Sequence, residues 1–331
     1  MGAVEPVARQ ALPRHGDLRH PPGRPVIGER LLAAQRARFA AADPLVPAPP
    51  GPPDGELLTA ATASGERVAA VLQEKSHAPR TLDLLWSAQR VWQLFPFPGE
   101  TGTEGVDALL RAWRHRMDAE SPGPDSACTV TWPSRDAAAI RAFLNHGMVP
   151  ASVLAIRTAP PPPEATADGV TVRQARPEDF EEVLDLTGLT FDYTALVTVR
   201  GRPEARELMT PQLRRNLAAG APIWLAETAG VATALADCGW IDSAPGTWAA
   251  ELLPHGHWGY VNNVATRPEA RGRGVGRALM SVVHRDFARR GAVGTYLYYN
   301  PTNPLSSVFW PRQGYRPLWT FWEVEPASAL R

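Results

Sequence analysis

The stretch that most constrains the fold of this chain is residues 260–280, which read YVNNVATRPEARGRGVGRALM. An apolar run at 260–266 predicts a strand, and an apolar-periodic pattern over 275–290 predicts a helix. Between them lies the sequence Arg-Gly-Arg-Gly-Val-Gly at 271–276. Backbone N–H groups at a helix N-terminus attract anions, and glycines let the backbone approach them closely. The stretch therefore predicts an anion site, with Arg271 and Arg273 adding positive charge.

Two common phosphate-binding motifs are absent from this loop. It lacks the Gly-Lys-Ser/Thr ending of a P-loop. It also lacks the G-x-G-x-x-G spacing, with an acid after the next strand, that is typical of dinucleotide-binding domains. The anion site is therefore expected to hold a different phosphate-bearing ligand.

A second informative stretch is residues 295–315, TYLYYNPTNPLSSVFWPRQGY. Aromatic and β-branched residues predict a strand at 294–299, followed by a helix at 303–312 and a final strand near 317–325. Asn303 is a suitable helix N-cap, and Gly314 suits the helix C-terminus.

Together the two stretches resemble the GCN5-related N-acetyltransferase (GNAT) family. Arg271, Gly274 and Gly276 fit the family's Arg/Gln-x-x-Gly-x-Gly/Ala signature, after a strand that ends in Val-x-Thr. The second family pattern is an Asn followed by a small residue three on, a Tyr seven on, and a Gly-aromatic pair. It is met by Asn303, Ser306, Trp310, Gly314 and Tyr315. Trp310 is the one departure, because the family usually has Tyr there.

An internal repeat extends the resemblance to the first half of the chain. At one constant offset, the second pattern recurs as Asp136, Ala139, Phe143, Gly147 and Met148. A repeat this long indicates two domains rather than a solenoid. The expected fold is mixed α/β, with two tandem GNAT-like domains, each a twisted, mostly antiparallel sheet flanked by helices.

Proline-rich segments suggest where the domains begin and end. We expect a poorly ordered N-terminus at 1–25, a degenerate GNAT-like domain at 26–158, a proline-rich linker at 159–168 and a catalytic GNAT domain at 169–331. A length of 331 residues suits two domains of ordinary size.

The first domain lacks the glycine-spaced phosphate loop. Its matching region reads PFPGETGTEGVDALLRAW, and aligning Gly105 with Gly274 places Glu104 near Arg273 and Asp107 at Gly276. Carboxylates there would repel a pyrophosphate. This domain is therefore predicted not to bind coenzyme A in the usual way. Its expected role is to cover the active domain and help form the acceptor pocket.

The resemblance implies that acetyl-CoA is the co-substrate, with direct transfer of the acetyl group to an amine and no metal. Backbone N–H groups would hold the pyrophosphate, the strand end would pair with the pantetheine arm, and the Val264 N–H would polarise the thioester carbonyl. The residues implied in cofactor binding are Val264, Ala265, Thr266, Arg271, Gly272, Arg273, Gly274, Val275, Gly276, Arg277, Asn303, Ser306 and Trp310.

The groups that move protons are less well defined. An indole N–H is not a usable acid, so Tyr298, Tyr299, Tyr315 or water would replace the family's Tyr at position 310. His257, at the start of the central strand, is the first candidate for the base, because histidine titrates near neutrality. The alternatives are Glu251 and Asp237.

Tryptophans before the central strand offer a candidate acceptor wall. They are Trp240, Trp248 and Trp258, which are interpreted either as acceptor contacts or as core residues. The adjacent Asn262 and Asn263 are unusual for a central strand and are expected to bond substrate or main chain.

Composition narrows the class of function. The formal net charge is zero, so no electrostatic footprint for nucleic acid or an anionic membrane is present. No secretory core and no long apolar run are found, which favours a cytoplasmic protein. The two cysteines form no metal or disulfide pattern.

The leading hypothesis is an acetyl-CoA-dependent N-acetyltransferase acting on a small-molecule amine. Two alternatives stay open: a protein lysine or N-terminal acetyltransferase, and a non-catalytic acyl-CoA-binding regulatory protein. The oligomeric state and the acyl chain length are left open by the sequence.

Overall fold

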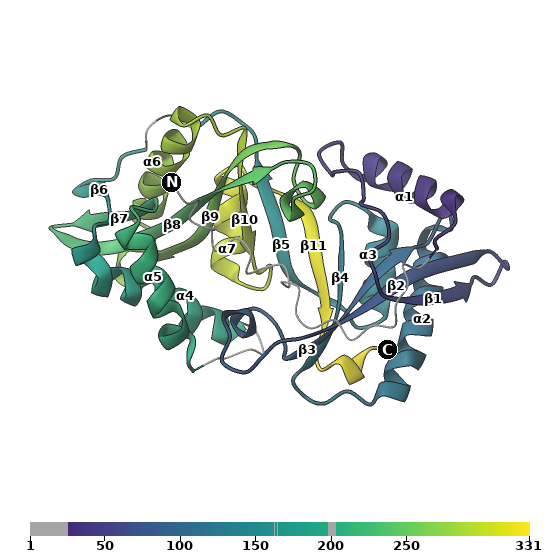
Figure 1. The fold of residues 1–331 in the computed structure, drawn as a ribbon. Helices are drawn as coiled ribbons and strands as arrows, with labels where there is room; N and C mark the ends of the chain where they lie inside the picture. Colours follow the sequence, from purple (N-terminus) through teal and green to yellow (C-terminus); the bar gives the residue numbers. More distant parts are fainter. Residues whose placement is uncertain (1–25, 162, 164, 198–202) are drawn as a thin grey trace.

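A computed structural model describes residues 26–161, 163, 165–197 and 203–331. The predicted poorly ordered segment 1–25 lies outside these residues. The described strands form one 11-stranded sheet in the order β1-β2-β3-β4-β11-β5-β10-β9-β8-β7-β6 (Figure 1). Most neighbouring strands are antiparallel, and β3–β4 and β9–β10 are parallel. The mixed α/β class expected from the sequence is confirmed.

The first half of the chain contributes three helices, five strands and a short 3₁₀ helix among the described residues. They are α1 (Glu29–Ala42), β1 (Glu56–Ala61), β2 (Arg67–Ser76), η2 (Leu82–Leu85), β3 (Arg90–Phe97), α2 (Gly102–Glu120), β4 (Ser126–Pro133), α3 (Ala137–Asn145) and β5 (Val149–Arg157).

The second half supplies the remaining helices and strands. They are β6 (Val170–Gln174), α4 (Phe180–Val197), α5 (Ala205–Ala218), β7 (Ile223–Thr228), β8 (Val231–Ser243), β9 (Gly256–Thr266), α6 (Val275–Arg289), β10 (Gly294–Tyr299), α7 (Pro304–Arg312) and β11 (Arg316–Val324). The strand predicted at 294–299 is β10. The helix predicted at 303–312 begins one residue later, because Asn303 is its cap: its Oδ1 accepts from the N–H groups of Leu305 and Ser306 at 3.0 and 3.3 Å.

The repeat predicted from the sequence is also a repeat of structural elements. Helices α3 and α7 begin at Ala137 and Pro304, and strands β5 and β11 begin at Val149 and Arg316. Both pairs of starts are separated by the same offset that relates the two copies of the motif. The parallel pairs end at equivalent places too, at Leu94↔Val130 and at Val261↔Leu297.

The two halves exchange their last strands. Strand β11 of the second half lies between β4 and β5, and β5 of the first half lies between β11 and β10. The two sheets expected from the sequence are therefore joined into one. Local pattern cannot reveal this exchange, because equivalent strands of a repeat carry the same pattern and can pair with either half.

A shared core accompanies the exchanged strands. One hydrophobic cluster contains Trp92, Trp132 and Phe143 of the first half together with Trp319 and Trp322 of β11. The side chains of β8 alternate between the two faces of the sheet. Ala234 and Ala236 pack with α6, while Leu235 packs with α4 and α5 on the opposite face.

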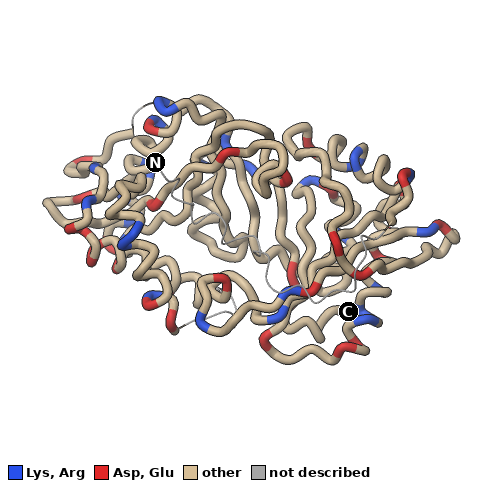
Figure 2. The backbone as a smooth tube through the Cα atoms, viewed as in Figure 1, with Lys and Arg blue, Asp and Glu red and all other residues tan. Residues whose placement is uncertain are grey.

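Charge is distributed over both halves. Figure 2 shows basic and acidic residues interspersed along the backbone of both halves, in keeping with the neutral net charge. In the described part of the chain, no helix has the length and apolar character needed to cross a bilayer.

A buried histidine makes stability sensitive to acid. His284 of α6 is 2 % exposed, and its Nε2 lies 3.0 Å from the Tyr315 hydroxyl. Burial, aided by the positive charge of Arg157, lowers the pKa of His284 to about 3. In the unfolded chain the pKa is about 6.5. The stabilisation is therefore complete above pH 6.5 and is lost as pH falls towards 3, by at most about 1.4 kcal/mol per pH unit.

Urea unfolding of the wild type and His284→Gln at pH 7, 5 and 4 tests this prediction. The wild type is expected to lose stability more steeply below pH 6.5 than the variant. Equal slopes would mean that the imidazole is not held neutral by the fold.

Candidate active site

The predicted anion loop has the backbone that its glycines require. Strand β9 ends at Thr266, a short 3₁₀ turn covers Pro268–Ala270, and α6 begins at Val275. Gly272 and Gly274 have φ angles of 76° and 80°, which L side chains rarely adopt. The first N–H groups of a helix have no intrahelical partner, so those of α6 can donate to an anion.

The arginines of this loop differ in their contacts. Arg271 Nε donates to the Thr266 carbonyl at 3.0 Å, and its guanidinium lies 5.5 Å from the centroid of the Tyr193 ring. Arg271 thereby braces the loop against β9 and α4. Arg273 and Arg277 are placed differently: both are exposed, and both carry their charge beside the start of α6.

Strands β9 and β10 separate beside this loop. Their parallel pairing stops at Val261↔Leu297. At the next residue, the register between β8 and β9 shifts so that Asn262 is left out of the pairing. Such a bulge bends a strand and redirects its side chains. The two strands therefore diverge from Asn262 and Tyr298 onward.

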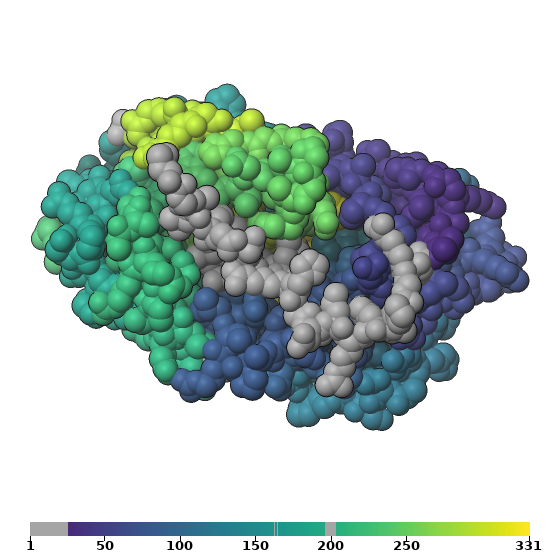
Figure 3. All heavy atoms as spheres, viewed as in Figure 1, coloured from purple at the N-terminus to yellow at the C-terminus, as the bar shows by residue number. Residues whose placement is uncertain are grey.

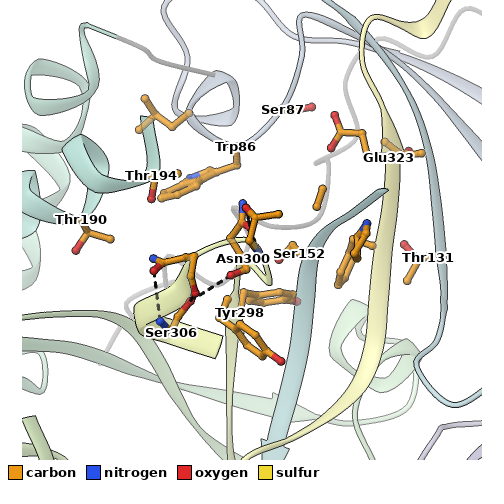
Figure 4. A pocket seen from close by; sticks show the side chains of 18 of the residues that line it. Trp86, Ser87, Thr131, Ser152, Thr190, Thr194, Tyr298, Asn300, Ser306 and Glu323 are labelled. Carbon is orange, nitrogen blue, oxygen red and sulfur yellow. Dashed lines mark hydrogen bonds between the residues drawn. The ribbon is translucent and has the colours of Figure 1, made fainter. Parts of the chain in front are cut away.

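A cavity of about 530 Å³ begins at this divergence and is lined by both halves of the chain (Figure 4). Its size is in the range of small-molecule sites. Four of the residues implied in cofactor binding are brought together in its wall: Val264, Asn303, Ser306 and Trp310. Ala265 is buried. Thr266 and the loop at 271–277 are not part of the wall; Thr266 ends β9, and the loop leads into the first turn of α6.

The side chains of α7 are fixed by local bonds. Asn303 caps the helix, and Ser306 Oγ donates to the carbonyls of Asn300 and Asn303, both at 3.1 Å. Trp310 is 7 % exposed and packs edge-on against Phe309 and Tyr315. Its indole therefore serves as a wall of the cavity.

The structure separates the three tyrosines considered as proton donors. Tyr315 is buried among His284 and Thr295 and does not line the cavity. Tyr298 and Tyr299 do line it. The Tyr298 hydroxyl has no hydrogen-bond partner among the described residues, and burial raises its pKa well above the usual 10. Tyr298 therefore keeps its proton; the residue lines the cavity while its hydroxyl oxygen is buried.

The predicted base His257 lies elsewhere. Its ring stacks on Trp240 at 4.5 Å, its Nδ1 is 2.5 Å from Asp242 Oδ1, and its side chain is 41 % exposed. Along the extended strand, it is displaced from Val264 by about 23 Å at roughly 3.3 Å per residue. Neither His257 nor Glu251 lines the cavity.

Asp237 occupies a different position, directly behind the bulge. It is 2 % exposed, and its Oδ2 accepts from Asn262 Nδ2 at 2.6 Å. The Tyr260 hydroxyl in turn donates to Asn262 Oδ1 at 2.9 Å. Burial raises the pKa of Asp237 to about 6. Asp237 is therefore placed to hold Asn262 and Tyr260, which line the cavity, in position.

The tryptophans proposed as an acceptor wall do not reach the cavity. Trp258 is 1 % exposed in the core, with its Nε1 donating to the Pro254 carbonyl at 2.8 Å. Trp240 packs against His257 and Phe287. Neither they nor Trp248 line the cavity.

Sequence reasoning missed the histidine and the acidic residues that line the cavity from outside the two motifs. They are His77 and Asp83, between β2 and β3, and Glu323 and Glu325, on and just after β11. For Glu323, the alternation of residues along β11 could have revealed its position. Trp322 and Val324 are buried while Phe321 and Glu323 are not, an alternation that places Glu323 on the opposite face from the core.

The first half has no counterpart to the anion loop. At the offset observed between the two halves, the positions equivalent to 271–276 are 104–109, which lie within helix α2. The sequence alignment of Gly105 with Gly274 is thus two positions out of register. Helix backbone replaces the loop, so its N–H groups beyond the first turn are already bonded.

Helix α1 covers the same region of the first half. Arg38 makes two bonds to Asp136, the cap of α3, one of them between Nη2 and Oδ1 at 3.1 Å. Leu31 lies 3.0 Å from where a Cβ on Gly99 would stand, in the turn before α2. Helix α1 therefore bridges the N-terminal ends of α2 and α3, the counterparts of α6 and α7 in the other half.

A family model described as "Acetyltransferase (GNAT) domain" matches residues 220–317. No curated protein matches the chain. Among solved structures, a GCN5-related N-acetyltransferase from Sphaerobacter thermophilus is 18 % identical, with 80 % of this chain and 79 % of that chain covered and a TM-score of 0.48.

Two further structures cover more of the chain. A GCN5-related N-acetyltransferase from Kribbella flavida is 16 % identical, with coverage of 92 % and 99 % and a TM-score of 0.42. A tandem GNAT protein from the clavulanic acid biosynthesis pathway is 15 % identical, with coverage of 90 % and 95 % and a TM-score of 0.44.

The family match, the anion loop and the parted strands define an acyltransferase. Residues 220–317 form a domain of the GNAT acetyltransferase family, as the two sequence motifs predicted.

Proposed function

We propose that this chain is an N-acetyltransferase that moves the acetyl group of acetyl-CoA directly to the amine of a small molecule. The observation that carries the proposal is the parting of β9 and β10 after Val261 and Leu297. This parting opens a cavity lined by both halves of the chain, and the free N–H groups at the start of α6 would bind the anion.

The acetyl donor, acetyl-CoA, would lie along the end of β9 and the start of α6. The free N–H groups at the start of α6 suit a pyrophosphate, with Arg273 and Arg277 nearby. Strand β9 no longer pairs with β10 from Asn262 to Val264. Its backbone there suits hydrogen bonds to the amides of the pantetheine arm. The Val264 N–H would then polarise the thioester carbonyl.

The reaction requires the amine nitrogen to attack this carbonyl while the bond between carbon and sulfur breaks. The acceptor ammonium loses two protons in all, the acetyl group becomes an amide, and the thiolate takes up one proton while the other leaves to solvent. Glu323 and Glu325 line the cavity, and one of them, or water, would accept a proton from the incoming ammonium. A hydrogen bond from Tyr298, which lines the cavity, would stabilise the departing sulfur.

We further propose that the residues of the acetyl-transfer step belong to 169–331 and that 26–158 completes the acceptor chamber without binding a second cofactor. Two residues of the linker at 159–168, Ala165 and Ala167, pack on the active half. Ala165 N–H donates to Ser281 Oγ of α6 at 3.2 Å. The Ala167 Cβ lies 3.6 Å from where a Cβ on Gly274 would stand.

The direct test is release of the free thiol of CoA from acetyl-CoA in the presence of a panel of small amines, with the acetylated product identified by mass spectrometry. Transfer to at least one amine is expected. If acetyl-CoA binds but no amine, free or peptide-borne, is acetylated, the regulatory-protein alternative replaces this proposal.

Substitution of Tyr298 by Phe tests the assigned proton donor. Loss of its hydroxyl is expected to lower kcat about tenfold, somewhat less than a full general acid supplies, with little change in the KM for acetyl-CoA. Tyr315→Phe is the control, because its hydroxyl is bonded outside the cavity. That variant is expected to lose thermal stability and keep its kcat when folded. Equal kcat for wild type and Tyr298→Phe would remove Tyr298 from the mechanism.

A further inference from the structure

The bulge in β9 is held by side-chain hydrogen bonds from both sides of the strand. Asn262, the residue left out of the pairing, donates through Nδ2 to Asp237 Oδ2 of β8 at 2.6 Å, and its Oδ1 accepts from the Tyr260 hydroxyl at 2.9 Å. The next residue, Asn263, is bonded to helix α4, because its Oδ1 accepts from Thr190 Oγ1 at 2.7 Å. Both ends of the Asn262 amide are therefore fixed.

Asp237 supports the bulge from behind the wall of the cavity. It is 2 % exposed and does not itself line the cavity. Its pair on β7 is Ile223, and Leu235, on the same face of β8, packs with α4 and α5. A buried carboxylate is costly unless it accepts hydrogen bonds, and the Asn262 amide supplies one. Any effect of Asp237 on the reaction would therefore pass through Asn262 and the bulge.

Helix α4, which carries Thr190, is braced by the first half of the chain. The segment around η2 packs against α4 and α5. Arg80 pairs with Glu207 at 2.6 Å, and the Trp86 and Phe191 rings are 5.1 Å apart. In Figure 3 the atoms of this segment (blue) lie against those of the second half (green), and Figure 4 shows Thr190 on α4 beside the cavity. The bulge therefore has a braced helix on one side and β8 on the other.

The bulge sets the direction of the peptide groups that follow it. Strands β9 and β10 stop pairing at Val261↔Leu297, immediately before Asn262, and Val264 lies two residues beyond it. An extra residue in a strand bends the strand and re-aims its groups. The Val264 N–H, proposed above as the donor to the thioester carbonyl, is therefore aimed by the way in which Asn262 is held.

We propose that Asp237 is a positioning residue for acetyl transfer: by holding Asn262 it fixes the bulge and aims the Val264 N–H at the thioester carbonyl. The proposal rests on the acetyltransferase function proposed above. As the amine attacks, the carbonyl oxygen gains negative charge, which a correctly placed N–H stabilises. A misplacement of about 1 Å can lower the rate about a hundredfold. In this role Asp237 neither binds the substrate nor accepts its proton.

Two substitutions of Asp237 in the full chain separate positioning from proton transfer. Asp237→Leu removes the acceptor of the Asn262 bond and is expected to lower kcat at least about tenfold, with less than about a threefold change in the Kd of acetyl-CoA. Asp237→Asn keeps an oxygen that accepts from Asn262 and is expected to retain kcat within about threefold. A general base would instead lose about a hundredfold or more in both variants. Release of the CoA thiol gives kcat, and calorimetry gives the Kd.

Asn262→Leu tests the same bond from its other end and serves alone should Asp237→Leu not fold. Its kcat is expected to fall about as far. The double variant Asp237→Leu/Asn262→Leu should lie within about twofold of the lower single variant, because both changes break one bond. Asp286→Leu is the matched control: Asp286 is a 6 % exposed carboxylate of α6, pairs with Arg289 and does not line the cavity. This variant should lose stability and keep its kcat.

The outcomes separate this inference from the proposed function. If folded Asp237→Leu keeps the wild-type kcat, or if Asp237→Asn loses as much as Asp237→Leu, the positioning role is wrong while the acetyltransferase stands. Additive losses in the double variant would mean that Asp237 does not act through Asn262 and would overturn the inference too. If the wild-type chain binds acetyl-CoA and acetylates no amine at all, the proposed function falls and this inference falls with it.

Discussion

Replacement of Gly274 by glutamate is expected to weaken acetyl-CoA binding at least about a hundredfold. The φ angle of 80° at Gly274 disfavours any L side chain, at a cost of about 1–2 kcal/mol. A carboxylate at this helix N-terminus would also occupy the anion site and repel the pyrophosphate. Isothermal calorimetry of the wild type and the variant measures the difference.

Gly291→Glu is the matched control for backbone strain. Gly291 follows the other end of the same helix with a φ of 83°, and a Cβ there would meet nothing within 4 Å. This variant should lose a similar amount of stability and keep its acetyl-CoA affinity. If both variants lose affinity equally, the loss reflects destabilisation of α6 and the loop is not the anion site.

Expression of residues 26–158 and 169–331 as separate chains is expected to yield two fragments that do not fold alone and that form a 1:1 complex together. Each fragment would carry an unpaired last strand, since β5 and β11 pair with each other and with the opposite half. Trp319 and Trp322 would also lose their core, at about 1.5–3 kcal/mol for each large side chain. Losses of this size are comparable to the whole stability of a domain.

Circular dichroism, size-exclusion chromatography and urea unfolding of each fragment, alone and mixed, provide the test. A full chain cleaved at a protease site inserted in 159–168 is the control and should stay associated. Cooperative unfolding of either fragment alone would contradict the exchanged sheet and support two independent domains.

The parts of the site that depend on neighbouring residues could be predicted from the sequence. The cap at Asn303, the strand at 294–299 and the turn conformations of Gly272 and Gly274 all follow from local rules of propensity and backbone freedom. The repeat was equally visible, because both halves keep the same order of elements at one constant offset.

The parts that depend on distant pairing could not be predicted. Nothing in the local pattern of β5 or β11 tells which sheet either strand joins, so the shared core and the joined cavity stayed hidden. Glu323 was missed as a cavity residue for the same reason, because it reaches the cavity only through the exchange. His257 illustrates the converse: it lies close to the motif in sequence, yet an extended strand carries it about 23 Å away from Val264.

The central claim is that the chain has one acetyl-CoA site, made by the loop at 271–277 and the parted strands β9 and β10. The most direct test is the stoichiometry of acetyl-CoA binding to the purified full chain by calorimetric titration. The account predicts one site per chain, because α2 replaces the loop in the first half. Two sites per chain would contradict the assignment of the first half, and no binding would contradict the acetyltransferase itself.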